Sequence, residues 1–161
     1  MSAEVLTASI EKLLKLHNSL YELTVQKTDI IKTGDMEALD QLLKEEQKHI
    51  AVIGQVEKER QKAVKEIVPN IEQPVFSDCM DVIDSTEKEK LKEMGKKLAL
   101  LVTNLKEQNF LNQQLIHQSL QFVNFSLGLL RPKPSNINYG PPTKNQKPSE
   151  QYSSGIFNSE A

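Results

Sequence analysis

The fold is decided by residues 30–39, which read Ile30-Ile31-Lys32-Thr33-Gly34-Asp35-Met36-Glu37-Ala38-Leu39. Gly34 suits the left-handed backbone conformation that ends many helices, because it carries no Cβ. Asp35 suits the N-cap of a following helix, and Glu37 is favourable in the first turn of that helix. The stretch therefore predicts a tight turn between two helices.

Apolar residues recur at helical spacing on both sides of this turn. Residues 3–32 carry them in a 4-3 pattern, which places one apolar face along a helix, with Ser2 expected to cap its start. Residues 36–68 continue the same pattern until Pro69 ends it. Two helices of similar length joined by a short turn predict an antiparallel hairpin.

A third and longer helix is expected over residues 87–130, with Thr86 and Glu89 as a capping box and Arg131-Pro132 as its end. Ser85 is nearly as good a candidate for the cap. Residues 69–85 fit either a short helix or a packed loop. Because the third helix is longer than either of the first two, it must bend or its far end must overhang the hairpin. The fold class that follows is all-α: a hairpin plus a long third helix, forming a coiled-coil-like three-helix bundle.

The chain divides into a helical domain, residues 1–131, and a tail, residues 132–161. The tail holds five of the seven prolines, together with many Ser, Asn, Gln and Lys residues. Such a segment buries too little apolar surface to offset the entropy lost on ordering. We expect the tail to be disordered.

Composition indicates an intracellular protein without a nucleic-acid or membrane partner. The net charge of −2 gives no electrostatic reason to bind nucleic acid or an anionic membrane. The N-terminus lacks the pattern of a secretory signal, and Cys79 is the sole cysteine, which fits a reducing compartment. The uncharged stretch 108–130 is long enough to span a bilayer, but its many Gln and Asn residues argue against membrane insertion. We expect a cytoplasmic location.

No arrangement of residues predicts catalysis, a metal site or a cofactor. The three histidines, His17, His49 and His117, fall on three different expected helices. The weaker hypotheses are a metal held by His17 and His117, and a nucleophilic Cys79. Arg60 lies in the apolar register beside Glu57. It forms either a register-setting ion pair or a contact to a carboxylate of a partner.

The third helix changes character along its length. Residues 87–107 are rich in charge, whereas residues 108–130 carry only amides, hydroxyls, one histidine, glycine and large apolar groups. The apolar groups lie on more than one face, and such a helix needs more than one neighbour. Two interpretations fit this pattern equally well. The segment is either a buried core helix or homodimer seam, or a docking surface for a helix of another protein.

Several stretches resemble the FlgN family of flagellar type III export chaperones, and within it the versions of Bacillus-like bacteria. They are residues 34–39 at the turn, Glu57-Lys58-Glu59-Arg60, Asn109-Phe110-Leu111-Asn112-Gln113-Gln114-Leu115, Asn138-Tyr139-Gly140 and the closing residues 156–161. No single stretch is specific, but their order and spacing cover nearly the whole chain.

The resemblance implies a cytoplasmic chaperone that is not an enzyme. It would bind the C-terminal helical segments of hook–filament junction (hook-associated) proteins, prevent premature assembly and deliver them to the export apparatus. The implied binding region is the last helix, where we expect the partner to contact Leu105, Asn109, Leu111, Asn112, Leu115, Ile116, Ser119, Phe122, Phe125 and Leu129. Two rival hypotheses are a self-associating structural or regulatory coiled-coil protein, such as a homodimer, and a small enzyme.

Overall fold

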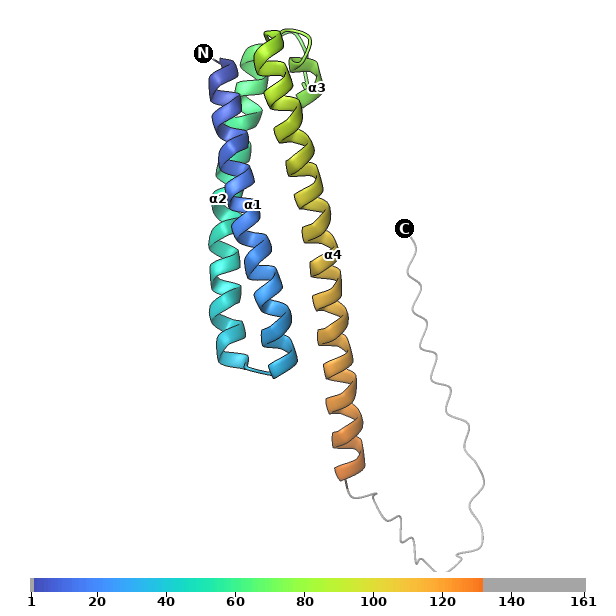
Figure 1. The fold of residues 1–161 in the computed structure, drawn as a ribbon. Coiled ribbons are helices and arrows are strands. Elements are labelled where there is room, and N and C mark those ends of the chain that lie inside the picture. The colour runs from blue at the N-terminus through green and yellow to red at the C-terminus, as the bar shows by residue number, and fades with distance from the viewer. Residues whose placement is uncertain (1, 132–161) are drawn as a thin grey trace, which may run out of the picture.

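The computed structural model describes residues 2–131, which are helical except for one turn and the connection before the last helix (Figure 1). The elements are α1 (Ser2–Thr33), α2 (Met36–Ile67), the single-turn α3 (Phe76–Cys79) and α4 (Ser85–Leu130). Within residues 2–131 there is no strand, so the predicted all-α fold is confirmed. The expected disorder of residues 132–161 concerns a segment outside the described residues.

The turn between α1 and α2 has the predicted chemistry. Gly34 adopts a φ of 72°, and its N–H donates to the carbonyl of Ile30 at 3.0 Å, which closes α1. Asp35 is the N-cap of α2, and its Oδ1 accepts the backbone N–H of Ala38 at 3.0 Å. The two residues reverse the chain within one helical turn and produce the antiparallel hairpin.

Two of the predicted caps are wrong. Ser2 is the first helical residue of α1, and its hydroxyl lies 3.5 Å from Glu66 on α2 instead of capping α1. The α4 helix begins one residue before Thr86, with Asp84 as N-cap, because the carbonyl of Asp84 already accepts the N–H of Lys88 at 2.9 Å. Thr86 therefore lies inside the first turn and cannot form the expected capping box with Glu89.

The α1 helix packs along both other long helices. It runs antiparallel to α2 and parallel to α4, so that Glu11 pairs with Lys90 near the start of both helices and Thr28 meets Asn112 further along. Among residues 2–131, no Cα atom of α2 lies within 8 Å of one in α4. At the level of the backbone, α1 is therefore the long helix that lies close to both of the others.

All three long helices share a core at the end opposite the turn. This open-end core contains Leu6, Ile10, Ala63, Val64, Val68, Cys79, Met80, Leu91 and Met94, with Phe76 and Ile83 packed against it. The α3 segment closes this end, since the Phe76 ring lies against Gly95 of α4, where a Cβ atom would stand only 3.2 Å from the ring. Gly95, which costs helix stability, makes room for that ring.

The α4 helix overhangs the hairpin. It has 46 residues against 32 in α1, a difference of about 20 Å at 1.5 Å per residue. Because α1 and α4 start at the same end and run in parallel, this excess projects past the Gly34 turn, as Figure 1 shows. Of the two predicted outcomes, bending or overhanging, the structure has the second.

Candidate partner-binding surface

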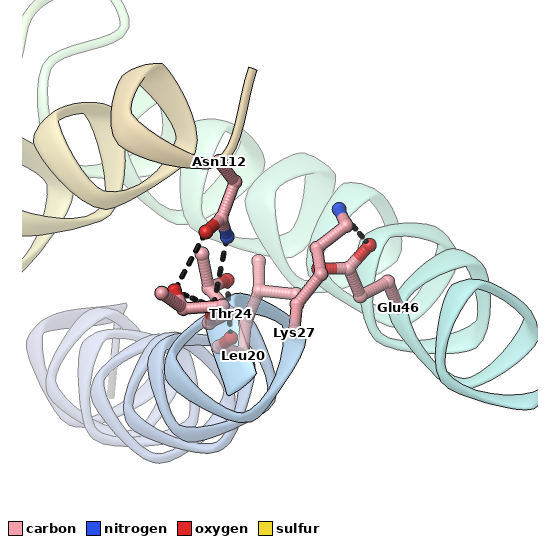
Figure 2. A network of polar contacts seen from close by, with 6 residues as sticks. Leu20, Thr24, Lys27, Glu46 and Asn112 are labelled. Atoms are coloured by element: carbon pink, nitrogen blue, oxygen red, sulfur yellow. Dashed lines mark hydrogen bonds and ion pairs between the residues drawn. The ribbon is translucent and has the colours of Figure 1, made fainter. Parts of the chain in front are cut away.

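The seam between α1 and α4 changes from apolar to polar as it approaches the turn. Leu101 and Leu105 of α4 are buried against α1. One and two turns further along, the residues facing α1 are Gln108 and Asn112, and α1 presents threonines instead of leucines. We refer to Thr24, Thr28, Gln108 and Asn112 as the polar clasp. Figure 2 shows Asn112 of α4 pointing toward Thr24 of α1.

The amide of Asn112 is the centre of the polar clasp. Asn112 is only 2% exposed; its Nδ2 donates to the carbonyl of Thr24 at 2.9 Å, and its Oδ1 accepts from the Thr28 hydroxyl at 2.6 Å. The Thr28 oxygen in turn accepts from Nε2 of Gln108 at 2.6 Å. Within the described residues, no buried side-chain N or O atom lacks a hydrogen-bond partner. Each such bond stabilises by about 1 kcal/mol net, because water would otherwise replace it.

An ion pair lies beside the polar clasp, between α1 and α2. Nζ of Lys27 is 2.8 Å from Oε2 of Glu46, and the two side chains are 14% and 10% exposed (Figure 2). Removing both charges from water costs about as much as their attraction returns, so such a pair adds specificity of pairing more readily than stability. The turn end of the bundle is thus joined by polar contacts on both sides of α1.

Beyond the polar clasp, α4 has few neighbours. From Ile116 to Leu130, every residue except Ser126 is exposed, and the exposed set includes eight large apolar side chains. They are Ile116, Leu120, Phe122, Val123, Phe125, Leu127, Leu129 and Leu130. Exposed large apolar side chains gathered on one segment in this way mark an interaction site more often than an accident of composition. We call residues 116–130 the overhang.

The structure divides the ten predicted site residues into two groups. Leu105 and Asn112 face α1 and are buried, and Leu115 is half-buried. The remaining seven are exposed: Asn109, Leu111, Ile116, Ser119, Phe122, Phe125 and Leu129. Five of these lie on the overhang. Binding of a partner to any of the ten stays a prediction, but α1 already occupies Leu105 and Asn112.

The predicted set omits residues that the structure places on the same surface. Leu120, Val123 and Leu127 are as exposed as the predicted residues, and they form a row with Ile116 at spacings of four and three. The apolar spacing of this row is visible in the sequence. The prediction missed it because it followed a single register along the helix, which runs through Ser119 and Phe122. Thr24 and Thr28 were likewise not predicted as partners of Asn112.

The other candidate chemical groups have structural roles. Nε of Arg60 donates to Oε2 of Glu57 at 2.8 Å in a two-pronged pair within α2, which holds the pKa of Glu57 below its usual value. The predicted ion pair is therefore present, but it lies within one helix, and its role in setting the register stays a prediction. Burial raises the pKa of the Cys79 thiol, with a smaller contribution from Asp78. Nδ1 of His17 lies 2.7 Å from the carbonyl of Leu13, one turn earlier in α1.

Residues 2–131 contain neither a cluster of metal-ligating side chains nor a helix able to cross a membrane. This part of the chain has no cluster of three or more His, Cys, Asp or Glu side chains placed to hold a metal ion. None of its helices combines the length and apolarity that crossing a bilayer requires.

Comparison with known proteins gives two matches of nearly full length. A family model described as FlgN protein matches residues 1–147. A protein of Bacillus subtilis strain 168, described as uncharacterized protein YvyG, is 33% identical over 148 residues, which is 92% of each chain. No solved structure matches.

Proposed function

Because this chain belongs to the FlgN family of flagellar export chaperones, we propose that it binds hook–filament junction proteins in the cytoplasm before their export. Binding keeps their C-terminal helical segments from assembling early and allows delivery to the type III export apparatus. FlgN is a family of chaperones and not of enzymes.

The single observation that supports this choice of site is the overhang. It presents large apolar side chains to solvent on a helix that carries no charge from Gln108 to Leu130. An amphipathic helix of another protein can bury its apolar face against such a surface, while the neighbouring amides donate to or accept from polar groups at the edge of the contact.

A chaperone that releases its cargo at an export gate needs moderate affinity. The overhang suits this need, because a helix without neighbours must lose motional freedom when it binds, and that loss offsets part of the contact energy. A few aromatic anchors such as Phe122 and Phe125, both exposed, would supply most of the binding free energy that is left after this loss.

The test is titration calorimetry of the full chain with purified junction proteins, with flagellin as a non-cognate control. Phe122→Asp should weaken binding by tenfold or more, roughly the 1.4 kcal/mol or more expected for a lost anchor. Lys15→Ala is the matched control, because Lys15 is exposed on α1 and lies far from the overhang in sequence. Equal weakening by both variants, or equal affinity for flagellin, would contradict the proposal.

Self-association through α4 is the competing hypothesis. It predicts that the free chain is a dimer and that Phe122→Asp converts it to a monomer without any junction protein present. Light scattering on the free chain at several concentrations separates this outcome from a chaperone that becomes larger only when its cargo is added.

A further inference from the structure

The apolar residues of the overhang and its approach form two rows on different flanks of α4. Row one contains Ile116, Leu120, Val123 and Leu127, and row two contains Leu111, Phe122, Phe125 and Leu129. The exposed Gln118 lies in row two between Leu111 and Phe122. All eight are between 37% and 71% exposed. At 3.6 residues per turn, the centres of the two rows stand about 150° apart around the helix axis. Phe110 and Leu130 fall outside both rows.

Polar residues separate the two rows on both sides. On the line that faces α1, Asn112 is followed at seven-residue spacing by Ser119 and Ser126. On the opposite side, the line is polar: Gln114, His117, Gln121 and Asn124. The far part of α4 therefore has two apolar flanks and two polar edges, which is the pattern of a helix placed between two others.

A second copy of this chain would not cover both flanks. A closed two-fold dimer buries the same patch on each copy, so two α4 helices would pair through one row and leave the other in water. Covering both rows with copies alone would need a ring or a tetramer with two kinds of interface, or an open chain of molecules. A single partner that supplies two helical surfaces covers both rows without such an assembly.

We propose that the overhang is the central helix of the chaperone–cargo complex, with one cargo chain supplying two helical stretches, one against each row. Row one extends from Ile116 to Leu127, about 16 Å, so each stretch needs at least three helical turns. The contacting faces of the cargo carry apolar residues and amides without charge, since α4 offers no charge to pair with from Gln108 to Leu130. This inference rests on the proposed function and specifies how the cargo is held.

Cysteine footprinting of the full chain tests this arrangement. Leu120→Cys and Leu127→Cys report on row one, Phe125→Cys and Leu129→Cys report on row two, and Gln121→Cys on the polar edge is the matched control. The native Cys79 is fully buried and does not interfere. Each variant is alkylated alone and with a junction protein that binds the unaltered chain, and the mass of the complex is measured by light scattering. Two reporters per row keep the test valid if one substitution abolishes binding.

Cargo should slow alkylation by about tenfold or more in both rows and by less than about twofold at position 121, because a thiol under a packed helix reacts only when the contact opens. The complex should contain one chain of each protein.

Protection of one row, or a complex with two cargo chains, overturns the inference and leaves the proposed function standing. Protection of a row in the free chain at high concentration indicates a second copy as occupant and overturns it too. Failure of every junction protein to bind overturns the proposed function and this inference together.

Discussion

The two ends of the α1–α4 seam are built from different chemistry. At the open end, Leu6 and Leu91 are completely buried in a core that α2 and α3 complete. At the turn end, Thr28 and Asn112 meet through hydrogen bonds, α2 is remote from α4, and α4 continues past α1 into the overhang. One helix therefore belongs to a closed core over its first part and to an open surface over its last part.

We expect this difference to separate the residues that stabilise the fold from those that bind a partner. Apolar side chains that leave a core make no favourable contact with water that replaces the lost packing. The amide of Asn112 and the hydroxyl of Thr28, in contrast, can replace their mutual hydrogen bond by hydrogen bonds to water at little net cost. The open end should fix the fold, and the turn end should hold α4 in register while letting it respond to a partner.

The largest loss of folding stability is expected from a substitution in the open-end core. Leu91→Ala removes a fully buried side chain and should lower the free energy of unfolding by about 2–5 kcal/mol. Phe125→Ala, on the exposed overhang, should change it by less than about 0.5 kcal/mol. Urea unfolding followed by circular dichroism measures both. Equal losses would mean that the overhang is packed in solution, which would break the comparison.

The polar clasp should show a smaller effect that depends on which partner is removed. Asn112→Ala removes the acceptor of the Thr28 hydroxyl and the donor to the Thr24 carbonyl, and it should cost about 1–3 kcal/mol. Adding Thr28→Val in an Asn112→Leu background removes both partners; the half-buried Gln108 loses its Thr28 acceptor but can bond water instead, so the pair should recover most of that loss. If the double variant is as unstable as Asn112→Ala, packing and not hydrogen bonding holds this end of the seam.

Substitutions in the hairpin turn should lower the stability of the α1–α2 hairpin without changing the binding properties of the overhang. Asp35→Ala removes the cap of α2 and should cost about 1 kcal/mol. Affinity for a junction protein should stay unchanged, since the turn makes no part of the two apolar rows. Asp35→Asn, which retains a capping oxygen, is the control. A parallel loss of stability and affinity would show that the turn supports the binding surface.

The smallest effect concerns Glu57, whose pKa the bond from Arg60 lowers from its ordinary value of 4.5. A carboxylate with a lowered folded-state pKa contributes stability that is complete above pH 4.5 and disappears as the pH falls through the folded-state pKa. Glu57 is partly exposed, so solvent screening limits the contribution to less than about 1 kcal/mol. Glu57→Gln should be slightly less stable than the unaltered chain at pH 7, and the difference in the free energy of unfolding should shrink as the pH falls below 4.5. A difference that grows at low pH would contradict this assignment.

Much of this fold follows from local sequence. The conformational preferences of Gly34 and Asp35 predict the turn between α1 and α2. Helical periodicity predicts the ends of the three long helices to within two residues. The overhang follows from helix length alone. These features depend on residues close together in the chain, which is why the sequence predicts them well.

Features that depend on contacts between distant residues were not predicted. Periodicity shows that Asn112 is in a seam but not that Thr24 and Thr28 would face it, 84 to 88 positions away. Helix propensity marks Gly95 only as unfavourable in α4, and its contact with Phe76 depends on how α3 packs. For the candidate site, the sequence located the uncharged stretch, but only the position of α1 separates covered residues such as Leu105 from exposed ones such as Phe122.

Hydrogen exchange along α4, with and without cargo, tests the central claim most directly. In the free chain, amides of residues 116–130 should exchange much faster than those of residues 91–105, because a helix without neighbours opens at low free-energy cost. Adding a junction protein should slow exchange strongly in residues 116–130 and little in residues 91–105. Uniform strong protection of α4 before cargo is added, or no change at 116–130 when cargo binds, would contradict the account and place the binding surface elsewhere.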